Sequence, residues 1–113
     1  MAWLESVPDE RLFLSAVSLG EIQAGIEMTR VQDHAKAQMI EAWIDRVVAT
    51  FQVLPMDATA FRLWAKLMHR QSETLYEDAM IAATALTHKL TVVTRNVRDF
   101  SRFPVPLLNP FEI

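Results

Sequence analysis

Residues 74–100, which read TLYEDAMIAATALTHKLTVVTRNVRDF, constrain the fold more than any other part of the chain. The first half is rich in Ala, Leu, Ile and Met, and Thr74 with Glu77 three residues later is typical of a capping box. The sequence therefore predicts a helix over residues 74–88. Residues 90–94 form a short apolar and β-branched run, which predicts a buried parallel strand directly after that helix.

Asp78 is the residue of the predicted helix that packing alone does not explain. At about 100° per residue it falls on the apolar side beside Ala82 and Ala85, whereas Glu77 faces solvent and is explained by capping. A buried carboxylate costs several kcal/mol unless a cation or hydrogen-bond donors meet it. However, an Asp in the first turn also gains about 0.3–1 kcal/mol from the helix dipole. Both interpretations of Asp78 stay open on this residue alone.

Polar residues directly after the predicted strand favour a functional site. Arg95, Asn96, Arg98 and Asp99 follow its carboxyl end, where ligands bind in open α/β sheets. Four basic residues and one acid lie between positions 89 and 102, a local positive patch that could position a phosphate backbone. A solvated loop is the commoner explanation of such a run, and the net charge of −3 argues against nucleic-acid binding over the whole surface.

Composition limits the class of protein. A length of 113 residues allows one domain with a core, and 51% hydrophobic with 22% charged residues indicates a folded, soluble chain. No apolar run is long enough to cross a bilayer, so we expect no membrane association. Cysteine is absent, which excludes disulfides and thiolate metal sites and agrees with a cytoplasmic location.

The remaining segments predict alternating strands and helices. We expect strands over residues 11–15, 53–54 and 105–108, and helices over residues 18–29, 31–51 and 58–70, the last capped by Asp57. This order predicts a small α/β domain with a parallel sheet. The apolar residues of the long helix at helical spacing are Ala35, Met39, Ala42, Trp43, Val47 and Phe51, and we interpret Met39 and Trp43 as core or as a partner surface.

Glu21 has two interpretations. Ser18 and Glu21 match a second capping box, and a glutamate at that position normally reaches back to its own helix start. From the residues alone, capping is therefore favoured over catalysis for Glu21.

Four segments of the chain together resemble a known family. AVSLGEIQAGI, VLPMDATAFRLWAKL, EDAMIAATALTHKLTVVTRNVRDF and the closing LLNPFEI are similar to a PIN-domain protein of the VapC toxin type, close to the FitB-like branch. The resemblance runs along essentially the whole chain. It implies a PIN-like α/β fold and an Mg²⁺- or Mn²⁺-dependent endoribonuclease that hydrolyses RNA phosphodiesters. It also implies a toxin that forms a homodimer and pairs with a small VapB-like antitoxin.

The resemblance also implies roles for individual residues. Matched by motif, the metal ligands are Glu21, Asp78 and Asp99. Asn96 joins them in catalysis, and both Asn96 and Asp99 are retained because families differ over which of the two completes the site. The residues that would place the RNA backbone are Arg95, Arg98 and Arg102.

One part of the family pattern is not found in this sequence. Members normally begin with a strand that ends in a motif such as D-T-N, whose aspartate is the first metal ligand. The resemblance therefore implies one PIN-like domain over residues 1–113 that is incomplete at its N-terminus. The alternative function is a catalytically inactive module that only binds an antitoxin or another copy of itself.

Overall fold

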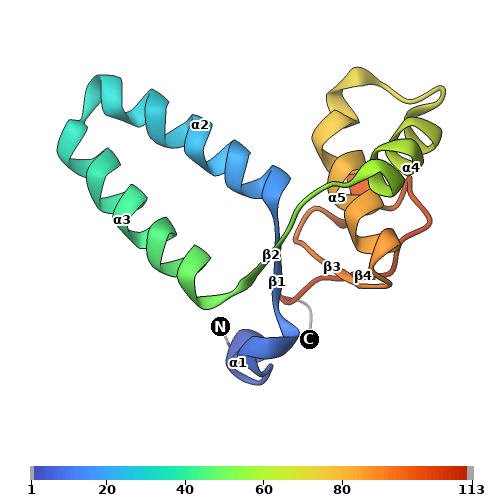
Figure 1. The fold of residues 1–113 in the computed structure, drawn as a ribbon, viewed down its shortest axis with the longest axis horizontal. Helices are drawn as coiled ribbons and strands as arrows, with labels where there is room; N and C mark the ends of the chain where they lie inside the picture. The colour runs from blue at the N-terminus through green and yellow to red at the C-terminus, as the bar shows by residue number, and fades with distance from the viewer. Residues whose placement is uncertain (1, 112–113) are drawn as a thin grey trace. The chain divides into compact units, whose positions relative to one another are not determined.

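The structure, a computed structural model, describes residues 2–111 and divides them into two units (Figure 1). The first unit is Val7–Leu54, and the second holds the described residues of Met1–Ser6 and Pro55–Ile113. Each unit contains one pair of parallel strands. The prediction of one domain over residues 1–113, incomplete at its N-terminus, stays a prediction.

The first unit is a helical hairpin closed by two strands. After a 3-10 turn, η1 (Asp9–Arg11), its elements are β1 (Phe13–Ser15), α2 (Ala16–Gln32), α3 (His34–Thr50) and β2 (Gln52–Leu54). β1 pairs in parallel with β2, so that Phe13 lies opposite Gln52 and Ser15 opposite Leu54. α2 and α3 pack along each other in Figure 1. The predicted order of strand, helix, helix and strand is confirmed.

The start of α2 corrects the interpretation of Glu21. The Ser15 side chain caps the helix, because its Oγ accepts a hydrogen bond from the Val17 backbone N–H at 3.2 Å. Ser18 is therefore inside the helix, and the predicted capping box of Ser18 and Glu21 is wrong. Glu21 lies exposed in the second turn of α2, where capping does not explain it.

A single residue, Asp33, joins α2 to α3. Its backbone N–H donates to the Thr29 carbonyl at 2.7 Å, and its Oδ1 accepts from the Lys36 N–H at 3.0 Å. The predicted helix over residues 31–51 is therefore wrong at its start, because Asp33 ends one helix and caps the next.

The apolar core of the hairpin differs from the prediction. Its buried side chains are Ile26, Ala37 and Ile44, with Leu19, Ile40 and Val47 packed against them. Met39 is 74% exposed and Trp43 is 52% exposed, so the interpretation of these two residues as core is wrong. α3 carries two apolar stripes, and the one that contains Ile40 and Ile44 packs against α2. The partner-surface interpretation of Met39 and Trp43 stays a prediction.

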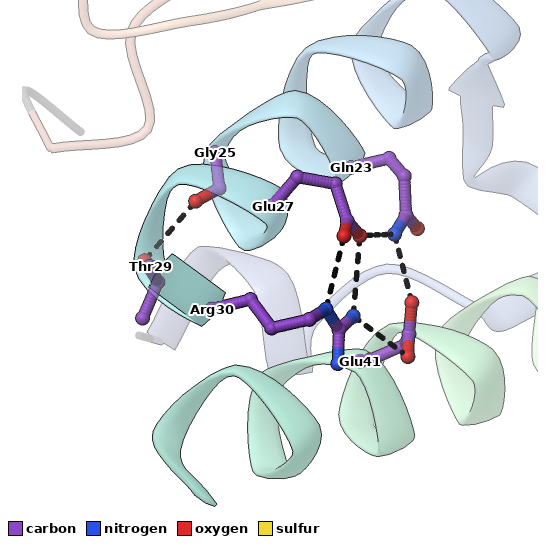
Figure 2. Close-up of polar contacts among 6 residues, drawn as sticks. All are labelled: Gln23, Gly25, Glu27, Thr29, Arg30 and Glu41. Atoms are coloured by element: carbon purple, nitrogen blue, oxygen red, sulfur yellow. Dashed lines mark hydrogen bonds and ion pairs between the residues drawn. The ribbon is translucent and has the colours of Figure 1, made fainter. Parts of the chain in front are cut away.

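A charged cluster also ties α2 to α3 (Figure 2). The Arg30 guanidinium donates to Glu27 at 2.9 Å and to Glu41 at 3.1 Å, and the Gln23 amide donates to each of these carboxylates at 2.7 Å. Hydrogen bonds from Arg30 and Gln23 lower the pKa of Glu27, and those from Gln23 and Arg30 lower the pKa of Glu41. Both acids therefore stay ionised and matched by donors. We call these four residues the Arg30 cluster.

The second unit packs one helix, two short strands and the residues after them against the alanine-rich face of a central helix. Its elements are α1 (Ala2–Glu5), α4 (Ala58–Met68), η2 (Glu73–Leu75), α5 (Tyr76–Thr87), β3 (Val92–Val93), α6 (Val97–Phe100) and β4 (Leu107–Leu108). α4 packs against α5, whose Ala79 and Ala82 are fully buried. β3 pairs in parallel with β4. The Asp57 side chain caps α4 as predicted, by accepting from the Ala60 N–H at 2.9 Å.

In the part of the chain that the structure describes, no helix has both the length and the apolar character to cross a membrane.

Candidate functional site

The start of α5 leaves two acidic side chains without a capping role. The preceding 3-10 turn, η2, is capped by Ser72, whose Oγ accepts from the Thr74 N–H at 3.3 Å. α5 then begins at Tyr76 with Leu75 at its N-cap position and no side-chain capping bond. The predicted capping box of Thr74 and Glu77 is therefore wrong, because Thr74 belongs to the preceding turn. Glu77 and Asp78 both lie in the first turn of α5, and neither takes part in a capping box.

Asp78 lies half-buried on α5, next to the buried Ala79. Its pKa is raised above the ordinary value, first because burial removes water from the carboxylate, and then because the Asp99 and Glu77 carboxylates repel it. Asp99 lies in α6 and Asp78 in the first turn of α5, so the fold brings acidic groups from two elements within electrostatic reach. The expected inward orientation of Asp78 agrees with its partial burial.

The polar segment after β3 folds into the one-turn helix α6. Thr94 Oγ1 accepts from the Asn96 backbone N–H at 2.9 Å, and the Asn96 side-chain Nδ2 donates to Asp99 Oδ2 at 2.9 Å. These two bonds fix the orientation of the Asp99 carboxylate. Within the described residues, Asp99 Oδ1 and the Asn96 amide oxygen take part in no further hydrogen bond.

The donor set has the chemistry that a hard divalent cation requires. Mg²⁺ and Mn²⁺ prefer oxygen ligands, and Mg²⁺ is commonly held by one or two carboxylates together with water and substrate phosphate. Asp78 and Asp99 supply two repelling carboxylates, and a cation would relieve that repulsion. Over residues 2–111, however, no three His, Asp or Glu side chains gather closely enough to hold a metal ion. Glu21 belongs to the first unit, so its place beside Asp78 stays a prediction.

Three arginines near the acidic pair are exposed. The Arg95 guanidinium lies 4.4 Å from the centre of the Phe111 ring, in a cation–π contact. Arg98 and Arg102 form no ion pair with any described residue, since both ion pairs found among residues 2–111 involve Arg30. Their charges are therefore available to an anionic ligand, and the predicted role of the three arginines in binding RNA stays a prediction.

A small pocket of about 180 Å³ adjoins Asp99. It is lined by Ser72, Thr74, Leu75, Asp99 and Arg102. Ser72 and Thr74 line this pocket, whereas the sequence interpretation gave Ser72 no role and treated Thr74 as a helix cap. The signal available in the sequence was the pair of hydroxyl residues, Ser72 and Thr74, shortly before the acidic residues of the next helix.

Comparisons with known proteins agree with this architecture. The sequence profile of the PIN domain matches residues 1–106. The chain is 32% identical to the VapC ribonuclease Y4jK of Sinorhizobium fredii, over 99% of this chain and 84% of that protein. It is 29% identical to the toxin FitB of Neisseria gonorrhoeae, over 98% and 84%. The crystal structure of FitAcB from N. gonorrhoeae superimposes with a TM-score of 0.86 at 28% identity, over 99% and 84%. The predicted PIN-like α/β fold and the resemblance to VapC-type toxins are confirmed.

Proposed function

Because this chain belongs to the PIN domain family, we propose that it is a metal-dependent endoribonuclease and the toxin of a toxin–antitoxin pair. The observation that carries this proposal is that Asp78, half-buried in the first turn of α5, has a raised pKa because of burial and because of repulsion from the Asp99 carboxylate of α6. Relatives that are named ribonucleases support the reaction class.

The acidic residues serve to hold the cation and the phosphodiester in one place. Asp78, Asp99 and Glu21 would hold this cation, as the family resemblance implies. A bound Mg²⁺ or Mn²⁺ ion contributes charge neutralisation at the phosphate and a lower pKa of its bound water. Asn96 donates to Asp99 Oδ2 at 2.9 Å and would hold the carboxylate of this proposed ligand in place.

The basic residues serve to position the RNA backbone. Arg95, Arg98 and Arg102 are exposed near the acidic residues, and phosphate contacts of this kind fix the register of a nucleic acid without reading its sequence.

The partners that we propose are an antitoxin of the VapB kind and a second copy of this chain, in the cytoplasm. Support comes from similar solved structures that are complexes, among them a toxin–antitoxin complex from Klebsiella pneumoniae, with a TM-score of 0.73 at 26% identity over 99% of this chain and 83% of that one. The exposed Met39 and Trp43 on α3 offer an apolar surface for either partner.

Cleavage of a mixed RNA pool tests the proposed reaction. The full chain is assayed with Mg²⁺, with Mn²⁺ and with a chelator, beside Asp78→Asn and the matched control Asp45→Asn, which removes an exposed carboxylate from α3. We expect metal-dependent cleavage that Asp78→Asn lowers by about 100-fold or more and that Asp45→Asn leaves unchanged. Cleavage by Asp78→Asn at the parental rate would remove Asp78 from the site.

One observation favours a second candidate function, a catalytically inactive binding module. Within the described residues of the second unit, no third metal-ligating side chain joins Asp78 and Asp99, so this unit alone supplies fewer acids than the family resemblance implies. A folded chain that cuts no RNA with either metal, yet binds the antitoxin or dimerises in light scattering, would establish this alternative. Metal-dependent cleavage would exclude it.

A further inference from the structure

Two opposite charges line the pocket beside Asp99 without pairing. The pocket lies between η2 and α6, and Asp99 and Arg102 contribute its charged groups. Neither takes part in an ion pair among residues 2–111, where both ion pairs involve Arg30. The hydrogen-bonding capacity of the Arg102 guanidinium is therefore available to a ligand in the pocket.

The hydroxyl groups of the pocket leave one donor free. Ser72 Oγ and Thr74 Oγ1 lie 2.9 Å apart and share one hydrogen bond, and Ser72 Oγ also accepts from the Thr74 N–H. The bond between the two hydroxyl groups uses one of their two protons, so the other proton can be donated to a ligand. Asp99 Oδ2 accepts from Asn96, whereas Oδ1 makes no hydrogen bond within the described chain. The pocket thus offers several donors and one acceptor beside the apolar Leu75.

This mixture of groups matches the edge of an unpaired nucleobase better than it matches a phosphate. A phosphate only accepts hydrogen bonds, and the Asp99 carboxylate would repel it. Guanine presents the adjacent acceptors O6 and N7, which arginine binds in bidentate fashion. Its N1–H and N2–H groups can donate to a carboxylate. RNA-binding proteins commonly read sequence in this way, through hydrogen bonds to bases that are not paired.

We propose that the pocket lined by Ser72, Thr74, Asp99 and Arg102 binds an unpaired guanine base of the RNA substrate. Arg102 reads O6 and N7 instead of contacting the RNA backbone, which leaves Arg95 and Arg98 as the phosphate-binding residues. The free hydroxyl proton supplements Arg102, and Asp99 Oδ1 accepts from the Watson–Crick edge. Because Asp99 also belongs to the acidic pair, the bound guanine lies next to the phosphodiester that is cut. The choice of RNA as ligand rests on the proposed ribonuclease function.

Binding without cleavage tests the pocket. The full chain is titrated in chelator against four fluorescent oligouridines that carry G, A, C or U at one central position, and anisotropy reports affinity. We expect the guanine oligomer to bind at least about 5-fold more tightly than the others. Equal affinity for all four, or selective loss of the guanine preference on adding inorganic phosphate, would overturn the proposal.

Two variants locate the preference. Arg102→Gln should abolish it, and the double variant Ser72→Ala/Thr74→Val should reduce it in part. Arg62→Gln is the matched control, since it removes the same charge from an exposed position on α4 outside the pocket. Thermal unfolding verifies that each variant is folded. A guanine preference that persists in folded Arg102→Gln would contradict the assignment.

Failure of the pocket and failure of the ribonuclease proposal are distinguishable. A chain that prefers guanine in chelator but cuts no RNA with Mg²⁺ or Mn²⁺ supports the pocket and overturns the nuclease. A chain that cuts RNA with metal but binds the four oligomers equally supports the nuclease and overturns the pocket.

Discussion

The Arg30 cluster and the acidic pair of Asp78 and Asp99 use the same kind of side chain in opposite ways. In the Arg30 cluster, Glu27 and Glu41 accept hydrogen bonds from a guanidinium and an amide, and their pKa values fall. In the acidic pair, burial and like charge raise the pKa of Asp78, and Asn96 is the hydrogen-bond donor found for Asp99 among the described residues. Matched charges hold two helices together, whereas unmatched ones are suited to a ligand that brings the missing charge.

The two regions therefore respond to pH with opposite signs. The lowered pKa values of Glu27 and Glu41 mean that their contribution to stability is present above the ordinary value of 4.5 and is lost as the pH falls through the folded-state pKa. The folded state instead retains the Asp78 proton above the ordinary value of 3.8, so stability decreases as the pH rises through the raised pKa. At neutral pH, the Arg30 cluster stabilises the fold and Asp78 destabilises it.

The largest change in stability is expected from the apolar core between α2 and α3. Ile26 is 2% exposed between α2 and α3, so Ile26→Ala should lower the free energy of unfolding by about 2–5 kcal/mol, through lost burial and a residual cavity. Urea unfolding measures the change. Val31→Ala, in the same helix at 87% exposure, should change little. A comparable loss in both variants would contradict the packing of the hairpin.

A smaller effect of the opposite sign is expected at the acidic pair. Asp78→Asn removes a repelled, half-buried carboxylate, so it should raise the melting temperature at neutral pH. The gain should shrink as the pH falls towards 3.8 and vanish below it, where Asp78 is protonated in both states. Melting curves from about pH 3 to about pH 7 measure it, with Asp45→Asn as the control. A variant less stable than the parent at neutral pH would show that Asp78 has a structural role.

The smallest effect is expected from removing the cation of the Arg30 cluster. Arg30→Met should lower the melting temperature slightly at neutral pH and less in acid, because without the Arg30 hydrogen bonds the pKa values of Glu27 and Glu41 are lowered less in the folded state. Salt should reduce the difference, since the pairs are partly exposed. Arg46→Met, on the exposed side of α3, provides the comparison. An effect that is independent of salt would mean that Arg30 acts through packing.

The sequence predicted the order of elements well because strands and helices alternate with clear apolar runs. It predicted helix starts poorly, because a Ser or Thr three residues before a Glu is a local signal that tertiary structure can override. Ser15 caps α2 at the point where β1 ends its pairing with β2, and Ser72 takes the position before η2. Which apolar stripe of α3 is buried depends on where α2 packs against it, and the pattern of α3 alone does not show this.

The candidate site also has parts that the local sequence indicates and parts that depend on tertiary structure. Helical spacing placed Asp78 on the apolar side of its helix, in agreement with its partial burial, and Asp99 stood out by its position after a predicted strand. The role of the two residues in a metal site stays a prediction. The hydrogen bond from Asn96 to Asp99 needed the one-turn helix α6, which a short polar segment does not predict. The pocket hydroxyls needed the turn η2, and the relation of Glu21 to the acidic pair depends on the placement of two separate units.

The single-residue joint at Asp33 makes the hairpin sensitive to insertions. If the joint at Asp33 kept its conformation, one residue added at the start of α3 would shift the helical phase of α3 by about 100°. One insertion would put Met39 and Trp43 where Ile40 and Ile44 now pack, and would turn Glu41 away from Arg30 and Gln23. The inner and outer apolar stripes of α3 would exchange places. Asp33 therefore sets the rotational phase that decides which face of α3 is core and which remains available to a partner.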